Sequence, residues 1–524
     1  MKRRFQYWIG FSTFLLVITC GLASPGNSTS IDLQAAKILQ ASHPSLVLTK
    51  ASFSAKTSRT FVNPVVRLPT AQRWLKHLQH DLLPFWILPT ALGKPIGNFP
   101  SVRCNDGSLL DLNHPCPEIK DSPWLMTNRQ YVVSISRQVY AYGVAFHLTG
   151  NIQYLKYAKS GVNYLRQKAF DRKRGGTYAF RNGKSQSWEP AIEYRNPQEQ
   201  AYALLGIGFY YYLTHDPEVL PDILATKEFI FKTYYNSDLD LLQWQMKDGD
   251  SGKALDKQLT AQLDQLNAYM LLLTPILSEP YKTTWKSDMV KLSKIMLNQF
   301  YSPKENLFFL SANSPTDQDI QHTEVDFGHT IKAMWMLHMI GALTGEQSLV
   351  SFADENGPKV LERAYLSQSG SWGSGIRQRG GINVDKDWWV YAELDQFTAS
   401  LALKKPSLVS YLPQTYCYWF NHFIDRQYGE VWSGVNGLTN QSLGTMPKQW
   451  PWKNGYHSFE HALVGYITAS QLHGNPVVLY YAFEQMPSVD TIHPYFYRAK
   501  IDEIKTILNR DTRNIYKITF SEVK

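Results

Sequence analysis

Apolar residues recur at helical spacing along most of the chain, from about residue 70 to residue 473. The runs predict twelve helices, over 70–88, 124–149, 152–169, 196–214, 217–235, 257–279, 282–300, 325–344, 346–368, 386–403, 406–424 and 457–473. They form six pairs, and the first member of each pair is the more apolar, as expected for a helix buried on all sides. Strands and helices do not alternate, which argues against a parallel-sheet fold.

Six helical pairs with buried first members favour an all-α toroid, with inner helices ringed by outer ones and a cavity at one end. An open helical solenoid is the alternative, but no repeat of fixed period supports it. We predict a signal peptide at 1–23, an N-terminal extension at 24–69, the helical domain at 70–473 and a C-terminal cap at 474–524. The cap is expected to be α/β-like, because VVLYYAF and NIYKITF read as strands, with a short helix at about 498–508.

The first residues resemble a secretory signal. Three basic residues at 2–4 precede an apolar run at 7–18, and small residues at 21–23 offer a cleavage site. We therefore expect a periplasmic or secreted protein. The apolar run is too short to span a membrane, so no span is expected in the mature chain. Lipoprotein anchoring at Cys20 is the less favoured alternative, because the residues before it match that signal poorly.

The charge of the chain does not change the predicted fold. The net charge is +9, and about +6 once the basic residues of the signal are removed. The basic residues are scattered, and their longest run is Arg172-Lys173-Arg174. A nucleic-acid-binding face shows clustering, so no nucleic-acid partner is expected.

Two cysteines flank a short loop. Cys104 and Cys116 enclose NDGSLLDLNHP, and in an oxidising compartment this spacing predicts a disulfide. Two free thiols in an irregular loop are the alternative.

Signatures of several common chemistries are missing. The chain has no GxGxxG, Walker loop, HExxH, GxSxG or CxxC motif, so dinucleotide, P-loop, zinc-protease and serine-hydrolase chemistry lack support. His322, Asp326 and His329 could ligate a metal, but we interpret them as unrelated polar residues at a helix start. No cofactor is expected.

Two histidines stand at the predicted starts of apolar helices. Thr323 and Asp326 are candidate caps before Gly328-His329, and the stretch WKNGYHS places His457 in the same way. The positive end of a helix disfavours imidazolium, and a neutral imidazole is what a general base near neutral pH requires. If both rings reach one cavity, they can act as a base and an acid.

A pair of tryptophans opens the predicted helix at 386–403. Trp388 and Trp389 point to different sides of the helix, so one of them can form a stacking platform for the C–H face of a sugar. Glu393 lies one turn after Trp389, on the same face, and can bind a sugar hydroxyl or pair with a cation.

Together these segments resemble the N-acylglucosamine 2-epimerase family, which includes cellobiose 2-epimerases and aldose–ketose isomerases. The similarity rests on GHTIKAMW, DWWVYAELDQ and WKNGYHS, on the stretch that begins RQVY at Arg137, and on the loop DRQYGEVW, all in the family's order. It covers roughly residues 70–473, and it implies an (α/α)6 barrel and proton transfer without a cofactor at the carbon next to an opened sugar's aldehyde.

The resemblance also implies roles for individual residues. His329 and His457 fall on the family's catalytic histidines, which remove and return the proton on opposite faces or move it between carbons. Arg137 falls on the arginine that polarises the carbonyl and stabilises the enediolate, a role that suits a permanently charged guanidinium. Tyr456, beside His457, is a candidate substrate contact. The expected partner is a mono- or disaccharide, and the protein is expected to be a monomer or homodimer.

Four positions depart from the family's pattern. Lys332 stands where the family has Glu, Asn267 falls on a second family Glu, Asp264 falls on a family His, and Glu460 replaces an Arg. Lys332 and Glu460 could form a swapped ion pair that preserves an orienting network. Otherwise the site has moved to another substrate or lost turnover.

Two other functions remain open. An (α/α)6-barrel glycoside hydrolase or lyase would use paired acids, such as Asp326 or Glu393 with Glu460, 5–10 Å apart across the cavity. A non-catalytic carbohydrate-binding protein would keep the aromatic platform without working acid–base groups.

Overall fold

Helices make up most of the protein in the computed structural model, which describes residues 63–524 except 121, 127, 190–193, 247–255 and 508–512. The predicted signal peptide and nearly all of the N-terminal extension lie outside the described residues. No helix of the described part is long and apolar enough to cross a membrane.

Six of the described helices are buried along almost their whole length. They are α5 (Val132–Thr149), α7 (Pro197–Thr214), α10 (Leu259–Gln265), α13 (Phe327–Thr344), α15 (Trp388–Ala402) and α17 (Gly455–Leu472). Helix α5 packs against both α7 and α17, α7 packs against α10, and α15 packs against both α13 and α17.

The second members keep one face in solvent. They are α6 (Ile152–Lys168), α8 (Leu220–Tyr234), α12 (Tyr281–Gln299) and α14 (Gln347–Ala364), and each buries one stripe of residues at helical spacing. A buried helix is therefore followed by a half-exposed one from α5 to α14, as predicted, whereas α17 packs against α1 near the start of the described chain.

Three of the predicted helices are interrupted. The first consists of α1 (Ala71–Lys76), the π-helical η2 (His77–Leu82) and α2 (Leu83–Trp86). Pro84 lacks an amide hydrogen, so it cannot continue the regular ladder to His80. The others are α10 followed by η5 (Leu266–Met270), α11 (Leu271–Leu273) and η6 (Thr274–Ile276), and η8 (Pro406–Ser410) followed by α16 (Leu412–Tyr418) and η9 (Trp419–Phe423).

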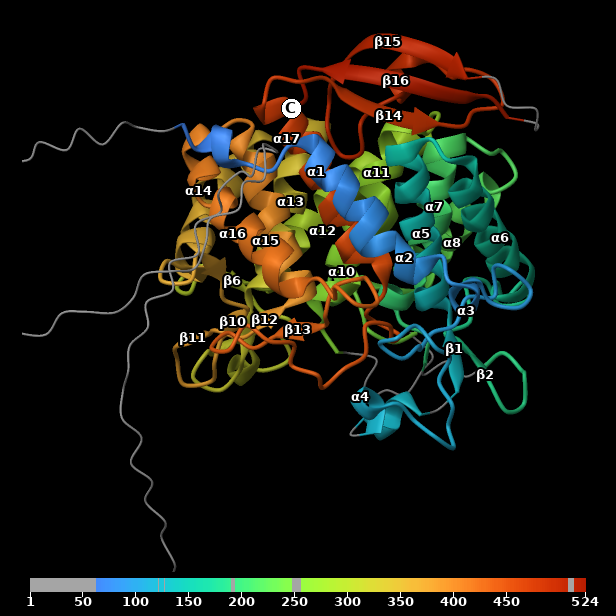
Figure 1. The fold of residues 1–524 in the computed structure, drawn as a ribbon, viewed down its shortest axis with the longest axis horizontal. Helices are drawn as coiled ribbons and strands as arrows, with labels where there is room; N and C mark the ends of the chain where they lie inside the picture. Colours follow the sequence, from blue (N-terminus) through green and yellow to red (C-terminus); the bar gives the residue numbers. More distant parts are fainter. Residues whose placement is uncertain (1–62, 121, 127, 190–193, 247–255, 508–512) are drawn as a thin grey trace, which may run out of the picture. The chain divides into compact units, whose positions relative to one another are not determined.

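Short antiparallel strands lie at the end of the helices where α5, α13 and α15 begin (Figure 1). The pairs are β1 (Arg129–Tyr131) with β2 (Phe180–Asn182), β3 (Tyr235–Asn236) with β4 (Leu241–Leu242), β5 (Tyr301–Ser302) with β6 (Leu307–Phe308), β8 (Tyr365–Leu366) with β9 (Ser371–Trp372), and β12 (Lys386–Asp387) with β13 (Gly434–Val435). A three-stranded sheet has the order β11 (Ile382–Asn383), β10 (Gly375–Ile376), β7 (Val325–Asp326). The helix expected from residue 124 begins only at Val132, after the short helix η3 (Pro123–Leu125) and β1.

The predicted disulfide is present at this end of the molecule. Cys104 and Cys116 are bonded, with their Cα atoms 6.0 Å apart, and α4 (Pro117–Lys120) follows directly. Cys104, Ile119 and Leu125 form a small apolar cluster separate from the main core.

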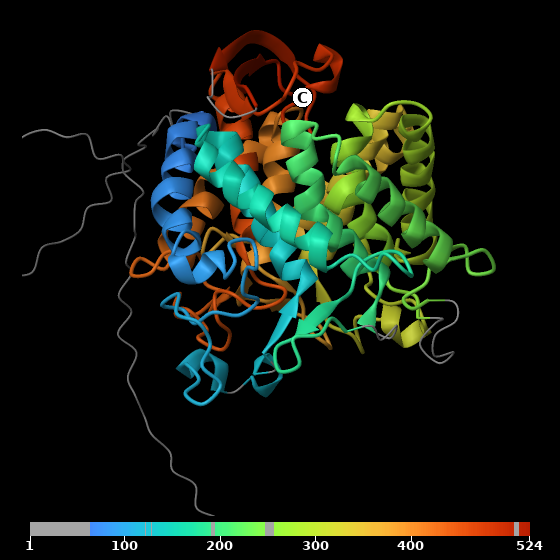
Figure 2. The same cartoon turned by 90° about the vertical axis from the view of Figure 1, so that its right-hand side faces the viewer.

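The C-terminal segment forms an antiparallel sheet at the opposite end of the helices (Figures 1 and 2). Its order is β14 (Val477–Tyr481), β16 (Ile515–Ser521), β15 (Lys500–Ile507). The helix expected at about 498–508 is wrong, because β15 occupies these residues. Strand β15 is largely exposed, so backbone pairing with β16 decides its conformation more than its own side chains do.

Candidate functional site

A cavity of about 440 Å³ lies where the buried helices begin. Six of the described helices each contribute side chains from their first two turns: Arg137 from α5, Gln198 and Tyr202 from α7, Thr260 from α10, His329 and Lys332 from α13, Trp388 and Trp389 from α15, and His457 from α17. The structure thus brings both candidate histidines and Arg137 to one hollow.

His329 is held by the residue that caps its helix. Asp326 is the N-cap of α13, and its Oδ1 accepts a hydrogen bond from the His329 amide at 2.7 Å. The other oxygen, Oδ2, lies 2.8 Å from Nδ1 of the His329 ring. Burial opposes charge on Asp326, but the interactions with His329 outweigh it, so the pKa of Asp326 lies below its usual value.

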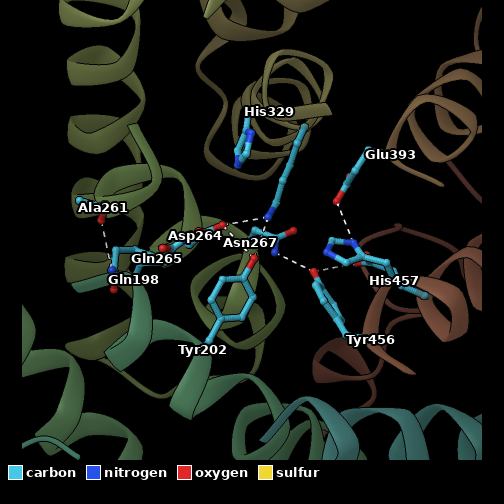
Figure 3. A network of polar contacts seen from close by, with 12 residues as sticks. Gln198, Tyr202, Ala261, Asp264, Gln265, Asn267, His329, Glu393, Tyr456 and His457 are labelled. Atoms are coloured by element: carbon cyan, nitrogen blue, oxygen red, sulfur yellow. Dashed lines mark hydrogen bonds and ion pairs between the residues drawn. The ribbon is translucent and has the colours of Figure 1, made fainter. Parts of the chain in front are cut away.

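His457 lies near two cations, Arg137 and Lys332. It is buried at the start of α17, where Asn454 caps the helix. Burial first, and then the charges of Arg137 and Lys332, lower the pKa of His457 well below its usual value. Its ring is therefore neutral at physiological pH. Nδ1 lies 3.4 Å from Oε1 of Glu393, without the geometry of a hydrogen bond. Figure 3 shows His457 beside Glu393, and His329 on a separate helix.

One indole ring connects the two histidines. The Trp389 ring centroid lies 4.6 Å from that of His329 and 5.9 Å from that of His457. The indole nitrogen of Trp389 donates to Asp387 at 3.1 Å, which fixes the ring at the cavity wall. Trp388 also lines the cavity, 6.4 Å from His457 between ring centroids.

Arg137 is clamped at the cavity wall. Its guanidinium lies 4.0 Å from the ring centroid of Tyr202, and it donates to the carbonyl of Trp452 at 2.5 Å. Its Nε has no hydrogen-bond partner in the described structure. The guanidinium therefore keeps donor capacity for a ligand.

Lys332 has a different partner from the one that the sequence suggested. Its ammonium donates to Asp264 at 2.8 Å and to the Tyr202 hydroxyl at 3.1 Å, and both members of the ion pair are buried. Gln198 donates to the other oxygen of Asp264 at 2.8 Å. The proposed Lys332–Glu460 pair is therefore wrong. Lys332 lines the cavity, whereas Asp264 supports it from beneath.

The remaining predicted contacts lie under the cavity and do not line it. Tyr456, Glu393, Glu460 and Asn267 are all buried. Asn267 donates to the Tyr456 hydroxyl at 2.8 Å, and Gln396 lies 3.4 Å from a carboxylate oxygen of each glutamate. Burial raises the pKa of Glu393 and of Glu460 above the usual range. Carboxylates placed beneath a histidine do not face each other across the cavity as a hydrolase pair would.

These buried groups are also the best metal-binding candidates. The ligand atoms of Glu393, His457 and Glu460 lie within 4.8 Å of one another. The positive charges of Lys332 and Arg137, which already act on His457, would oppose a cation there. His322, considered from the sequence, is exposed and contacts Asp319 instead.

Sequence reasoning missed several residues of the wall. They are Gln198, Tyr202, Trp244, Gln258, Thr260, Leu310, Asp387, Trp450 and Trp452. Asp387 could have been noticed, because it precedes the tryptophan pair at a helix start. Burial and the neighbouring Asp326 raise its pKa to about 7.

The chain is similar to known proteins over most of its described length. The family model described as N-acylglucosamine 2-epimerase (GlcNAc 2-epimerase) matches residues 118–460. A cellobiose 2-epimerase of Ruminococcus albus is 23% identical over 354 residues, covering 62% of this chain and 85% of that protein. One from Bacteroides fragilis is 24% identical over 273 residues, covering 49% of this chain and 67% of that protein.

Two solved structures are similar to this chain in fold. The cellobiose 2-epimerase of Bacillus thermoamylovorans B4167 superposes with a TM-score of 0.63 at 17% identity, covering 76% of this chain and 98% of that one. A D-mannose isomerase superposes with a TM-score of 0.62 at 17% identity, covering 76% and 97%. At such identities the likeness concerns the helical fold.

Proposed function

The chain belongs to the N-acylglucosamine 2-epimerase family of carbohydrate epimerases and isomerases, and we propose that it is a cofactor-independent sugar 2-epimerase or aldose–ketose isomerase. The observation that carries this proposal is that His329 and His457 line one cavity, the first hydrogen-bonded to Asp326 and the second with a lowered pKa. The substrate is a reducing mono- or disaccharide in its opened form.

We also propose that the helices close into an (α/α)6 barrel. The pairwise contacts support this, since α5, the first of the buried helices, packs against both the next one, α7, and the last one, α17. All six buried helices begin at the cavity. A closed ring explains how residues as distant in sequence as Arg137 and His457 line the same hollow.

In this mechanism His457 is the first base and His329 the first acid. The neutral His457 ring removes the proton from the carbon next to the aldehyde. His329, whose Nδ1 is hydrogen-bonded to Asp326, delivers a proton to the opposite face, which inverts that carbon. In the reverse reaction the roles exchange. Delivery to the neighbouring carbon instead would give a ketose.

Arg137 and Lys332 stabilise the enediolate between the two proton transfers. Both cations line the cavity, and both are fixed in advance by Tyr202, by the Trp452 carbonyl or by Asp264. Charges oriented before the reaction cost no reorganisation when the oxyanion forms. Trp388 and Trp389 supply apolar surface for the sugar ring.

We further propose that the protein is exported. The basic and apolar start of the chain and the Cys104–Cys116 disulfide support this, because such bonds persist in oxidising compartments.

Incubation with a panel of mono- and disaccharides in heavy water, followed by proton NMR, tests the function. We expect a new epimer or ketose, with deuterium at the α-carbon, and no product with the double variant His329→Ala/His457→Ala. Cleavage of a glycosidic bond without deuterium at that carbon would support the hydrolase alternative. Binding without any change of the sugar would support the non-catalytic alternative. Either result would overturn the proposal.

A further inference from the structure

Aromatic rings continue from the cavity towards the surface. Trp388 and Trp450 line the cavity with ring centroids 6.2 Å apart. Trp450 in turn contacts Trp124, with centroids 5.5 Å apart and the rings nearly perpendicular. Trp124 is 51% exposed and does not line the cavity. The half-exposed indole of Trp124, joined through Trp450 to the cavity wall, extends the aromatic surface of the cavity towards solvent.

The segment from Cys104 to Met126, which we call the disulfide segment, holds Trp124 in position. Trp124 lies in the short helix η3, and the next residue, Leu125, is buried against Cys104 and Ile119. Trp450 packs on the same small cluster. Figure 1 draws α4, just before η3, at the same end of the molecule as β10, β12 and β13. The exposed indole is therefore anchored at the end of the molecule where the cavity lies.

We propose that Trp124 and Trp450 form a distal subsite for a neutral sugar unit of a reducing oligosaccharide, whose reducing end occupies the cavity. Continuity of the ring contacts with the cavity wall identifies the occupant as an extension of the cavity's own ligand. The C–H face of a sugar suits an indole, and uncharged rings favour a neutral sugar. The proposal rests on the proposed function for the identity of the reducing-end sugar.

The substitution Trp124→Ala tests the subsite. We expect kcat/KM for cellotriose or mannotriose to fall about three- to tenfold, while the value for glucose or mannose stays within about twofold. Trp124→Phe should retain most of the activity on the trisaccharide. Tyr281→Ala is the matched control, because Tyr281 is 43% exposed on α12, outside the cavity wall, and should leave all values unchanged.

A parallel binding measurement separates the two proposals. Titration of the same variants with cellotriose, mannotriose, glucose and mannose by calorimetry needs no turnover. If no sugar is converted but Trp124→Ala still weakens only trisaccharide binding, the proposed function fails and the subsite stands. Equal losses for mono- and trisaccharides, or an unchanged trisaccharide affinity in Trp124→Ala, would overturn the subsite. Thermal midpoints of each variant identify losses that come from unfolding.

Discussion

The polar side chains beneath the site are coupled so closely that single changes should have large effects. Lys332 and Asp264 form a buried ion pair between two helices. Burying one partner without the other is far more costly than losing an exposed pair. Lys332 and Asp264 therefore stabilise the protein only as a pair.

The substitution Lys332→Glu should destabilise the fold by about 3–5 kcal/mol, because it places a second carboxylate beside Asp264. The double variant Lys332→Glu/Asp264→His should recover much of that loss by restoring opposite charges. Urea denaturation measures both. The same change at the exposed pair Lys359–Glu355 should cost about 1 kcal/mol or less. A double variant no more stable than Lys332→Glu would contradict the pairing.

Asp387 should make stability depend on pH. Burial and Asp326 raise its pKa to about 7, well above the value of about 4 for an unfolded chain. Between these values the folded protein retains a proton that the unfolded chain releases, so stability falls as pH rises from about 4 to about 7. In Asp387→Asn the decline should be smaller, by at most about 1.4 kcal/mol per pH unit. Identical slopes in urea titrations of the two proteins would refute this assignment.

At the scale of elements, regular patterns could be predicted and irregular ones could not. The helices expected at 152–169 and 282–300 correspond to α6 (Ile152–Lys168) and α12 (Tyr281–Gln299), because a one-sided apolar period is a local signal. The prediction of a helix in the C-terminal cap was wrong, because pairing with β16 determines the conformation of β15. Such pairing depends on residues elsewhere in the chain, so the sequence of the strand alone does not predict it.

The same distinction holds for the site. His329 and His457 could be predicted because each follows a capping residue at the start of an apolar helix. The partner of Lys332 could not, since Asp264 lies 68 positions away and another acid, Glu460, was equally plausible. Trp450 joins the cavity wall from a loop, where no periodicity identifies it.

The disulfide segment is the element most open to a direct test. Replacing both cysteines by serine, Cys104→Ser/Cys116→Ser, should destabilise this segment locally by about 2–3 kcal/mol, because the reduced loop gains chain entropy. We expect faster proteolytic nicking between residues 104 and 126 with unchanged helical circular dichroism. Unchanged nicking rates would show that the small apolar cluster holds the segment without the bond.

Across the whole molecule, the C-terminal segment reaches the buried groups beneath the cavity from the other end. The Tyr495 hydroxyl donates a 2.5 Å hydrogen bond to Glu460 and accepts one from the Tyr140 hydroxyl at 3.1 Å. Gln396 donates to Glu460 and to Glu393, at 3.4 Å in each case. A carboxylate oxygen of each glutamate lies within 4.8 Å of a ring nitrogen of His457. The sheet end and the cavity end of the molecule are thus joined through buried polar groups.

Tyr495→Phe should therefore destabilise the protein by about 1.5–3 kcal/mol, because a buried carboxyl loses its short donor. The variant Tyr495→Phe/Glu460→Gln should lose less than the sum of the two single changes, because the lost interaction is shared. Tyr480→Phe, in strand β14 of the same cap, is the control and should change stability little, because its hydroxyl makes no hydrogen bond to the described groups beneath the cavity. Strict additivity in denaturation experiments would rule out the coupling.

The most direct test of the two-histidine account is hydrogen exchange in single-histidine variants. In heavy water the wild type should interconvert two sugars and label the α-carbon of both. His329→Ala and His457→Ala should each lose interconversion by about a hundredfold or more. Each variant should still exchange the α-hydrogen of one sugar only, and a different one in each variant. Near-wild-type interconversion by either variant, or exchange of both sugars by one, would contradict the account.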